Sequence, residues 1–202
     1  MERKLLIASS NRGKIREIKE YLKGLELELI GLPELAPLPE VIEDGFTFRE
    51  NALKKARSRA AETGITTLAD DSGLEVDYLK GRPGVYSARY AGLLANDQAN
   101  NDKLLGELVG VPLLKRQARF KSVLVLVEPG GGAELIAEGC CEGIIIDSPR
   151  GNNGFGYDPL FYLPEYNKTM AELPLQLKNK ISHRAKALAK MKELLIDRKG
   201  EY

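Results

Sequence analysis

Short apolar runs typical of buried strands alternate along this chain with longer segments that have the period of an amphipathic helix. A strand is predicted over residues 4–9 and a helix over residues 13–23, where apolar side chains recur every three or four positions. Leu25, Leu27 and Leu29 then alternate with other residues, which predicts a second strand. This alternation of strands and helices indicates an α/β fold.

The next segment has clearer boundaries. Thr47 and Glu50 have the spacing of a capping box, so a helix is predicted to open there and to end near Gly64. An apolar run follows directly and stops at two adjacent carboxylates, Asp70 and Asp71. The sequence therefore predicts a strand that ends at this acidic pair.

The second half of the chain predicts two more helices and two long strands. The expected elements are a helix over residues 96–108, strands over 119–127 and 134–146 joined by a turn from Pro129 to Gly132, a glycine-rich loop over 151–156, and a C-terminal helix over 182–196 with Leu188, Met191 and Leu195 toward the core. The two long strands need not be parallel. The predicted class is therefore α/β with a mixed sheet.

Composition limits the kind of protein that this is. A chain of 202 residues with 43% hydrophobic content can bury a core as one domain or as two closely joined lobes. A formal charge of +1 gives no global reason to expect nucleic-acid or membrane binding. No apolar stretch approaches the roughly 20 residues of a membrane span, so a cytoplasmic protein is expected. Cys140 and Cys141 are adjacent, make a poor disulfide pair, and are interpreted as reduced packing residues.

The acidic pair continues as Asp70-Asp71-Ser72-Gly73, and it is the most informative segment of the chain. Ligands of mostly parallel sheets bind beyond the carboxyl ends of strands, where carboxylates can hold a hard cation against substrate phosphates. The alternative is a strand end capped by an Asx turn, because the same residues are common in turns.

A polar strand-to-helix turn supplies the second chemical signal. It consists of Ser9, Ser10, Asn11, Arg12, Gly13 and Lys14. Free N–H groups and the helix dipole favour a phosphate at such a turn, and Lys14 adds a full charge. The spacing does not match the Walker A loop. The alternative is a polar helix cap with Lys14 solvated on the first turn.

Two further segments carry chemical signals: a glycine-rich loop that suggests recognition of a base, and the segment from Lys178 to Arg184 at the start of the C-terminal helix. In the loop from Gly154 to Pro159, glycines flank Phe155. A base can stack on the Phe155 ring, and Asp158 can accept hydrogen bonds from it. The alternative is a tight turn with one buried aromatic ring. His183 is the only histidine, which excludes a multi-histidine zinc centre. Taken alone, His183 is more typical of a helix cap or a packing residue than of a ligand-binding group.

Together, these segments resemble the inosine triphosphate pyrophosphatase family, which acts on non-canonical purine nucleoside triphosphates. The matching motifs, in the family's order, are Ser9-Ser10-Asn11-Arg12-Gly13-Lys14, Phe48-x-Glu50-Asn51-Ala52, Ala69-Asp70-Asp71-Ser72-Gly73-Leu74, Pro83-Gly84-Val85-Tyr86-Ser87-Ala88-Arg89-Tyr90, Phe155-Gly156-Tyr157-Asp158-Pro159 and Ser182-His183-Arg184. They extend over most of the chain from Ser9 to Arg184.

The resemblance implies one domain over residues 1–202 with two lobes, built on a long mixed β-sheet flanked by helices, with a nucleotide cleft between the lobes. It also implies a homodimer, Mg²⁺ as cofactor, and hydrolysis of ITP, dITP or XTP to the monophosphate and pyrophosphate. Neither nucleic acid nor a membrane is an expected partner.

By position, the resemblance also assigns roles to residues of this chain. Asp71 would bind the metal and act as general base, with Glu43 as a second metal carboxylate. The predicted substrate-binding residues are Ser9, Ser10, Asn11, Arg12, Gly13, Lys14 and Lys55 for the triphosphate, Ser72 for another substrate contact, and Phe155, Gly156, Tyr157, Asp158, Lys178, His183 and Arg184 for the base.

The expected base preference follows from hydrogen-bond chemistry. Arg184 or a protonated His183 can donate to the 6-oxo group of hypoxanthine or xanthine, whereas adenine presents a donor there. ATP should therefore be a poor substrate, although this argument does not exclude GTP. Two alternatives stay open at this point: a nucleotide phosphatase of other specificity, and a nucleotide- or RNA-binding module without catalysis.

Overall fold

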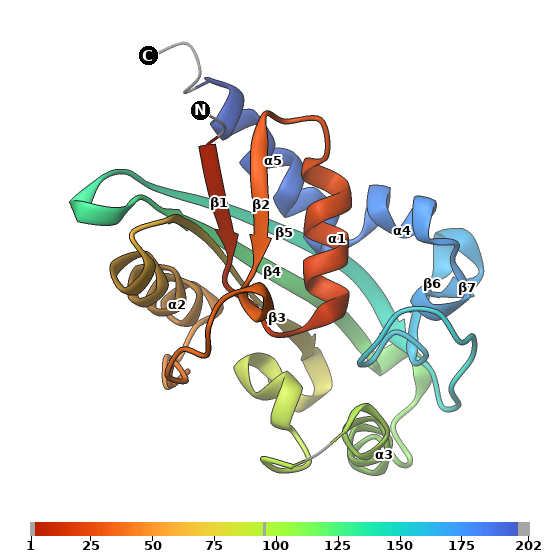
Figure 1. Cartoon of the computed structure of the whole chain (residues 1–202). Helices are drawn as coiled ribbons and strands as arrows, with labels where there is room; N and C mark the ends of the chain where they lie inside the picture. Colours follow the sequence, from red (N-terminus) through yellow and green to blue (C-terminus); the bar gives the residue numbers. More distant parts are fainter. Residues whose placement is uncertain (1–2, 95, 198–202) are drawn as a thin grey trace. The chain divides into compact units, whose positions relative to one another are not determined.

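The computed structural model describes residues 3–94 and 96–197 of the chain (Figure 1). The strands are β1 (Arg3–Ile7), β2 (Leu27–Gly31), β3 (Thr66–Val76), β4 (Gln117–Val127), β5 (Glu134–Ile145), β6 (Phe161–Leu163) and β7 (Lys168–Thr169). The α-helices are α1 (Arg12–Leu22), α2 (Phe48–Thr63), α3 (Asp97–Glu107), α4 (Leu175–Ile181) and α5 (His183–Asp197). Short 3-10 helices cover Leu32–Glu34, Asp77–Leu79, Gly84–Arg89, Leu113–Lys115, Pro129–Gly131, Pro164–Tyr166 and Met170–Glu172.

The strands form a mixed sheet in the order β2-β1-β3-β4-β5-β6-β7. β1 pairs in parallel with both β2 and β3, whereas β6 pairs antiparallel with β5 and with β7. In Figure 1, the arrows of β1 and β2 accordingly point the same way. The predicted α/β class with a mixed sheet is confirmed.

The chain divides into two compact units, and β3, β4 and β5 each contribute residues to both. The first unit takes in the chain up to Asp71, the segment Ser122–Gly139, and the chain from Arg184 onward. The second unit comprises Ser72–Lys121 and Cys140–His183. No helix within the described ranges combines the length and the apolar character that crossing a membrane requires.

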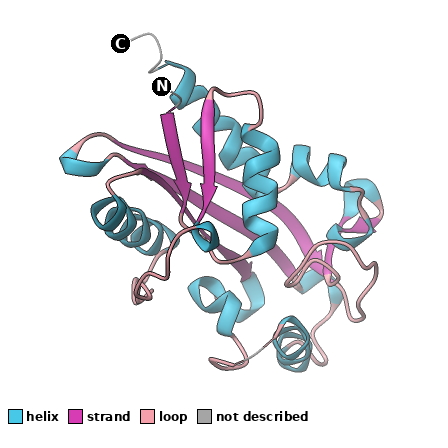
Figure 2. Ribbon diagram, in the orientation of Figure 1, coloured by secondary structure: helices cyan, strands magenta, loops and turns pink. Residues whose placement is uncertain are grey.

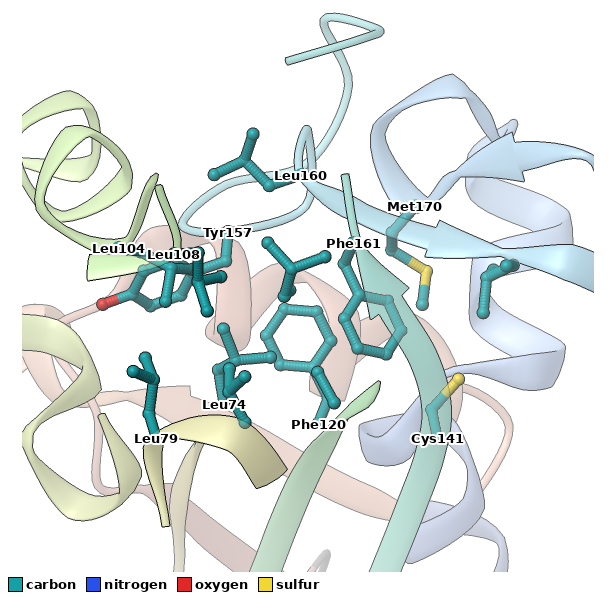
Figure 3. Close-up of a cluster of buried hydrophobic side chains, with 14 of the residues drawn as sticks. Leu74, Leu79, Leu104, Leu108, Phe120, Cys141, Tyr157, Leu160, Phe161 and Met170 are labelled. Atoms are coloured by element: carbon teal, nitrogen blue, oxygen red, sulfur yellow. The ribbon is translucent and has the colours of Figure 1, made fainter. Parts of the chain in front are cut away.

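Each unit has its own hydrophobic core. In the first unit, side chains of β1, α1, β3, β4, β5 and α5 pack together; they include Leu5, Ile7, Ile18, Leu22, Leu68, Leu124, Leu126, Leu188 and Met191. In the second unit, the core gathers around the tilted rings of Phe120 and Phe161, whose centroids are 4.4 Å apart (Figure 3). Tyr157, from the glycine-rich segment, is buried in this second core beside Leu104 of α3 and Leu108, the C-cap residue of that helix.

Most of the elements predicted from the sequence are confirmed. The capping box is present at the start of α2, where the Thr47 hydroxyl accepts a hydrogen bond from the Glu50 N–H. Gly64 ends this helix in the left-handed conformation, with φ of 66°. The turn between β4 and β5 lies at Pro129–Gly131, visible as a short helical segment at the tip of the two long strands (Figure 2). The short elements α4, β6 and β7 were not predicted.

One prediction about the acidic pair is wrong. The strand does not end at Asp70 and Asp71, because β3 continues through both residues to Val76. The apolar pattern resumes after the polar tetrapeptide, and Leu74 and Val76 are fully buried. The alternative of an Asx turn at a strand end is therefore also wrong. The two carboxylates project from the middle of a strand, and the burial of both requires polar or charged partners.

Candidate active site

The polar turn before α1 forms a helix N-terminus with well-defined caps. Asn11 is the N-cap residue, and its side-chain oxygen accepts a hydrogen bond from the N–H of Lys14 at 3.1 Å. The hydroxyl of Ser9 accepts from the N–H of Asn11 at 3.2 Å. Ser10 and Arg12 are exposed. The turn thus has the N–H groups and the dipole orientation that favour an anion.

Lys14 reaches from this helix to Asp70 of β3. Its Nζ lies 3.1 Å from Asp70 Oδ2, and only a small part of the lysine side chain is exposed. Burial lowers the pKa of Lys14, and the nearby Asp70 charge partly offsets that effect. The alternative of a solvated Lys14 is therefore wrong. In this structure the lysine is a buried charge with a carboxylate partner.

Asp70 is the centre of a buried polar cluster in the first unit. It accepts hydrogen bonds from Ser122 Oγ at 2.7 Å and from Arg184 Nε at 3.0 Å, in addition to its contact with Lys14. Burial alone would raise the pKa of Asp70, but Arg184 and Lys14 outweigh burial and lower it strongly. The ionised form of Asp70 is consequently favoured, and it anchors the two cations.

Arg184 binds a second carboxylate as well. Its Nη1 donates to Glu17 Oε2 of α1 at 2.5 Å, and the whole residue is 1% exposed. Burial opposes the charge of Arg184, but Asp70 and Glu17 raise its pKa. The residue predicted from the sequence to contact the base thus links the start of α5 to β3 and α1 within the first unit.

Asp71 faces a different set of groups, although it is the next residue. Lys55 Nζ of α2 lies 3.2 Å from Asp71 Oδ1 and 3.2 Å from Glu43 Oε1, and it donates to the Asp70 carbonyl at 3.0 Å. Burial raises the pKa of Asp71, Lys55 opposes that rise, and the net direction is upward. For Lys55, the attraction of Asp71 and Glu43 outweighs burial and raises its pKa.

Asn51 fixes both the Asp71 carboxylate and the loop before α2. Its Nδ2 donates to Asp71 Oδ2 at 3.3 Å, and its Oδ1 accepts from the N–H of Gly45 at 2.8 Å. A side chain at Gly45 would collide with Asn51 Oδ1, which is only 2.7 Å from the position of a Cβ atom. The Glu50 carboxylate also accepts from the Thr47 N–H. The N-terminus of α2 therefore holds the loop that carries Glu43.

The Glu43 and Asp71 carboxylates are suited to bind a divalent cation. Both contact the same ammonium group of Lys55, so a cation already lies between them. Within the described ranges, no three His, Cys, Asp or Glu side chains gather into a metal-binding group. Two carboxylates are nevertheless enough for Mg²⁺, which is usually held by one or two carboxylates together with water and substrate oxygens.

In the second unit, the loop from Gly154 to Asp158 is stabilised by a buried ion pair. Asp158 Oδ2 accepts from the Phe155 N–H at 3.0 Å and from Lys178 Nζ at 2.7 Å. Lys178 also lies over the Phe155 ring, 4.8 Å from its centroid. Gly154 has φ of 81°, and a Cβ atom there would lie 2.0 Å from Asp158 Oδ2. Glycine is therefore required at this position.

Three other predicted substrate-binding residues have defined places in the second unit. Tyr157 is buried, and its hydroxyl donates to the Ser87 carbonyl at 2.8 Å. His183 is buried and stacks on Phe120, with ring centroids 4.8 Å apart. Ser72 is half-buried in β3.

The structure brings the predicted residues together in two groups. In the first unit, Asp70 joins Lys14 and Arg184, and Lys55 joins Glu43 and Asp71. The second unit joins Phe155, Asp158 and Lys178. Sequence reasoning missed Glu17, Asn51 and Ser122 as partners of these groups. Asn51 was detectable, because it belongs to the Phe48–Ala52 motif. Glu17 and Ser122 carry no motif signal that marks them as partners of Asp70 and Arg184.

Comparison with known proteins places this arrangement in a family. The family model described as Ham1 family matches residues 5–194, which is nearly the whole chain. The chain belongs to the Ham1 family. A dITP/XTP pyrophosphatase of Geobacter sulfurreducens is 54% identical over 192 residues, covering 95% of this chain and 96% of the relative. A dITP/XTP pyrophosphatase of Desulforamulus reducens is also 54% identical, over 95% of both chains.

Solved structures of Ham1 proteins share the fold. The HAM1 protein of Coxiella burnetii has a TM-score of 0.88 and 44% sequence identity, and the match covers 96% of this chain and 99% of that one. These Ham1 relatives confirm the family suggested by the sequence motifs, as well as the α/β fold.

Proposed function

We propose that this protein hydrolyses the non-canonical purine nucleoside triphosphates dITP, ITP and XTP to the monophosphate and pyrophosphate. The observation that carries the proposal is the cluster in the first unit, where Asp71 and Glu43 converge on Lys55. The full-length similarity to dITP/XTP pyrophosphatases supports the choice of substrate. The proposed reaction removes deaminated purines from the nucleotide pool.

Asp71 is the proposed general base. Its carboxylate is buried, and hydrogen bonds from Asn51 and Lys55 fix its orientation. In this orientation it can accept a proton from an attacking water. In the protein without metal, burial raises the pKa of Asp71, which favours uptake of a proton, whereas a bound Mg²⁺ would act in the opposite direction. A bound Mg²⁺, held by Asp71 and Glu43, would neutralise phosphate charge and orient that water.

The triphosphate is proposed to bind at the turn before α1. The backbone N–H groups there and Lys14 are positioned for an anion, and Lys55 adds a second ammonium in the same unit. Positioning and charge neutralisation supply much of the catalysis of phosphate-transfer reactions. Ser9 to Lys14 are therefore assigned to the phosphates.

Base recognition is proposed for Phe155 to Asp158, Lys178 and His183 of the second unit; a base contact of Arg184, a residue of the first unit, stays a prediction of the family resemblance. The Phe155 ring offers a stacking surface, and Lys178 holds both the ring and Asp158 in place. Donors from Arg184 or His183 would favour a 6-oxo group over the 6-amino group of adenine. Contact of Ser72 with substrate, a homodimeric assembly and a cytoplasmic location stay predictions of the same family resemblance.

The test of the proposed chemistry is Asp71→Asn, which keeps the size of the side chain and removes its basicity. We expect kcat for ITP with Mg²⁺ to fall by about 100-fold or more, in the range typical of losing a general base, while ITP still binds. Asp147→Asn, at an exposed carboxylate of the second unit, is the matched control and should leave kcat unchanged. Equal rates for Asp71→Asn and wild type would remove Asp71 as the base.

A further inference from the structure

One face of α3 is directed at the loop that carries Phe155. Asp97, Asn101, Leu104 and Leu108 follow one another at intervals of four, three and four residues, so they lie on the same side of this helix and its C-cap. Leu104 and Leu108 are fully buried in the core that also contains Tyr157, as Figure 3 shows. The polar half of the same face contacts Gly156, the residue before Tyr157.

Both backbone polar groups of Gly156 are bound by this face. Asp97 Oδ2 accepts from the Gly156 N–H at 2.6 Å, and Asn101 Nδ2 donates to the Gly156 carbonyl at 3.1 Å. Gly156 has φ of 62°, in the left-handed region that glycine adopts readily. The two bonds fix the peptide groups on both sides of Gly156, which lies between Phe155 and the buried Tyr157.

Other contacts hold Phe155 and Tyr157, the residues on the two sides of Gly156. On one side, Asp158 and Lys178 hold Phe155, and on the other, the Tyr157 hydroxyl is bonded to Ser87. Between them, the backbone bond from the Asp158 N–H to the Phe155 carbonyl at 3.3 Å and the two α3 contacts hold the turn at Gly156.

The side-chain amide of Asn101 uses its donor but not its acceptor among the described residues. The residue is buried, but among the described residues its Oδ1 has no hydrogen-bond partner. A buried acceptor without a partner is unfavourable for folding. Among the described residues, the bond from Asn101 Nδ2 to the Gly156 carbonyl is therefore the favourable contact that the amide of this asparagine makes.

We propose that Asp97 and Asn101 are positioning residues that set the orientation of the Phe155–Asp158 loop and thereby determine base selectivity. The inference rests on the proposed function, because it assumes that this loop contacts the purine. Asp97 and Asn101 would act through Gly156 and would not touch the substrate. Loss of either bond should broaden the range of loop conformations, so that the ring and the Lys178–Asp158 pair select bases less well.

The experiment compares three substitutions within α3. Asp97→Ala removes the acceptor for Gly156, Asp97→Asn retains an acceptor oxygen, and Asp102→Ala removes only an exposed bond with Gln98 one turn further along. Asp102→Ala is the matched control, because the residue lies on the same helix and has no bond to the loop. Steady-state kinetics with ITP and ATP, IMP binding by calorimetry and the melting temperature are measured for each variant.

Asp97→Ala should raise KM for ITP and weaken IMP binding, each by roughly 5- to 10-fold, as expected for losing one hydrogen bond. Its kcat should change little, its ratio of kcat/KM for ITP over ATP should fall, and Asp97→Asn should recover most of the loss. Asp102→Ala should match wild type in all of these measurements.

Two outcomes would overturn the inference in an active enzyme. One is a Asp97→Ala protein with wild-type selectivity and IMP affinity. The other is a loss that follows only the melting temperature and is equal for Asp97→Ala and Asp102→Ala. Failure of the proposed function has a different signature, because the wild-type protein would then fail to convert ITP to IMP and pyrophosphate.

Discussion

At the scale of single residues, the surroundings of the two adjacent aspartates shift their pKa values in opposite directions. Asp70 contacts two cations and a hydroxyl, so despite its burial its pKa is lowered. Asp71 shares Lys55 with a second carboxylate, and burial raises its pKa. Their positions in the strand differ by one residue, which sends their side chains to opposite faces of the sheet. Asp70 therefore organises the cluster, and Asp71 is available for chemistry.

Asp70→Asn should destabilise the protein by about 3–5 kcal/mol near neutral pH, because it leaves Lys14 and Arg184 buried without their shared carboxylate. The lowered pKa gives this difference a pH dependence. Unfolded Asp70 takes up a proton below about pH 4 while the folded side chain stays ionised, so the wild-type advantage should shrink as the pH falls below that value.

Urea unfolding of wild type and Asp70→Asn at several pH values measures this difference directly. Asp44→Asn is the control, because that carboxylate is exposed and paired only with Lys54 at the surface. A difference between wild type and Asp70→Asn that stays constant from pH 7 to pH 3 would contradict the assignment of Asp70 as an ionised anchor.

A substitution of Arg184 can separate its two suggested roles, which are structural support and base recognition. Arg184→Lys keeps a positive charge for Asp70 and Glu17 but loses the planar group that reaches both. If Arg184 takes part in base recognition, the ratio of kcat/KM for ITP over ATP should fall by roughly 10-fold or more, as expected from the loss of a hydrogen bond to the 6-oxo group. Kinetics on both nucleotides, with circular dichroism to verify folding, test this. A lower melting temperature with an unchanged ratio would assign Arg184 to structure alone.

The sequence identifies candidate catalytic and binding residues better than it identifies the residues that form ion pairs and hydrogen bonds with them. Asp71 and Lys14 were predicted because they belong to local motifs with recognisable neighbours, whereas Lys55 was assigned by position through the family resemblance. The partner of Arg184, Glu17, lies 167 residues away along the chain, and such a pair depends on how α1 and α5 pack. Composition and local spacing contain no information about that packing.

At the scale of elements, α2 shows how local signals determine the position of a site. Its capping box and its Gly64 C-cap define both ends of the helix, and both were read correctly from the sequence. The same N-terminus holds the loop with Glu43 and directs Asn51 and Lys55 at Asp71. Helix capping and the geometry of the carboxylate pair are thus connected.

Thr47→Ala should therefore have two effects. Loss of the bond to the Glu50 N–H should lower the free energy of unfolding by about 1 kcal/mol. Because the loop that carries Glu43 depends on this cap, the Mg²⁺ concentration needed for half-maximal activity should also rise. Thr47→Ser keeps the hydroxyl and should behave like wild type in both measurements. A destabilised variant with an unchanged Mg²⁺ dependence would show that the loop is held without the cap.

The incorrect end of β3 has a physical explanation. Two adjacent carboxylates followed by Ser72 and Gly73 have turn propensity, and local propensity predicts a strand end. Lys55 and Asn51, which pair with Asp71, come from α2, and Arg184 and Ser122, which pair with Asp70, come from α5 and β4. These partners satisfy the carboxylates and allow the strand to continue. They are available only in the folded protein.

At the scale of the whole molecule, charge is balanced overall but not locally. The chain has a formal charge of +1, yet the first-unit cluster combines the cations Lys14, Lys55 and Arg184 with the carboxylates Glu17, Glu43, Asp70 and Asp71. The excess negative charge lies with the Glu43–Asp71 pair. A divalent cation would reverse its sign and favour a polyphosphate, which fits the proposed reaction.

Hydrolysis of ITP in ¹⁸O-labelled water, with the products identified by mass spectrometry, tests the central claim most directly. We predict that the protein with Mg²⁺ releases IMP and pyrophosphate, that the label enters IMP through attack on the α-phosphorus, and that chelation of the metal stops turnover. XTP should behave like ITP, and ATP should react much more slowly. Release of IDP and orthophosphate, or label in the pyrophosphate, would contradict the proposed reaction and favour a phosphatase or attack at another phosphorus.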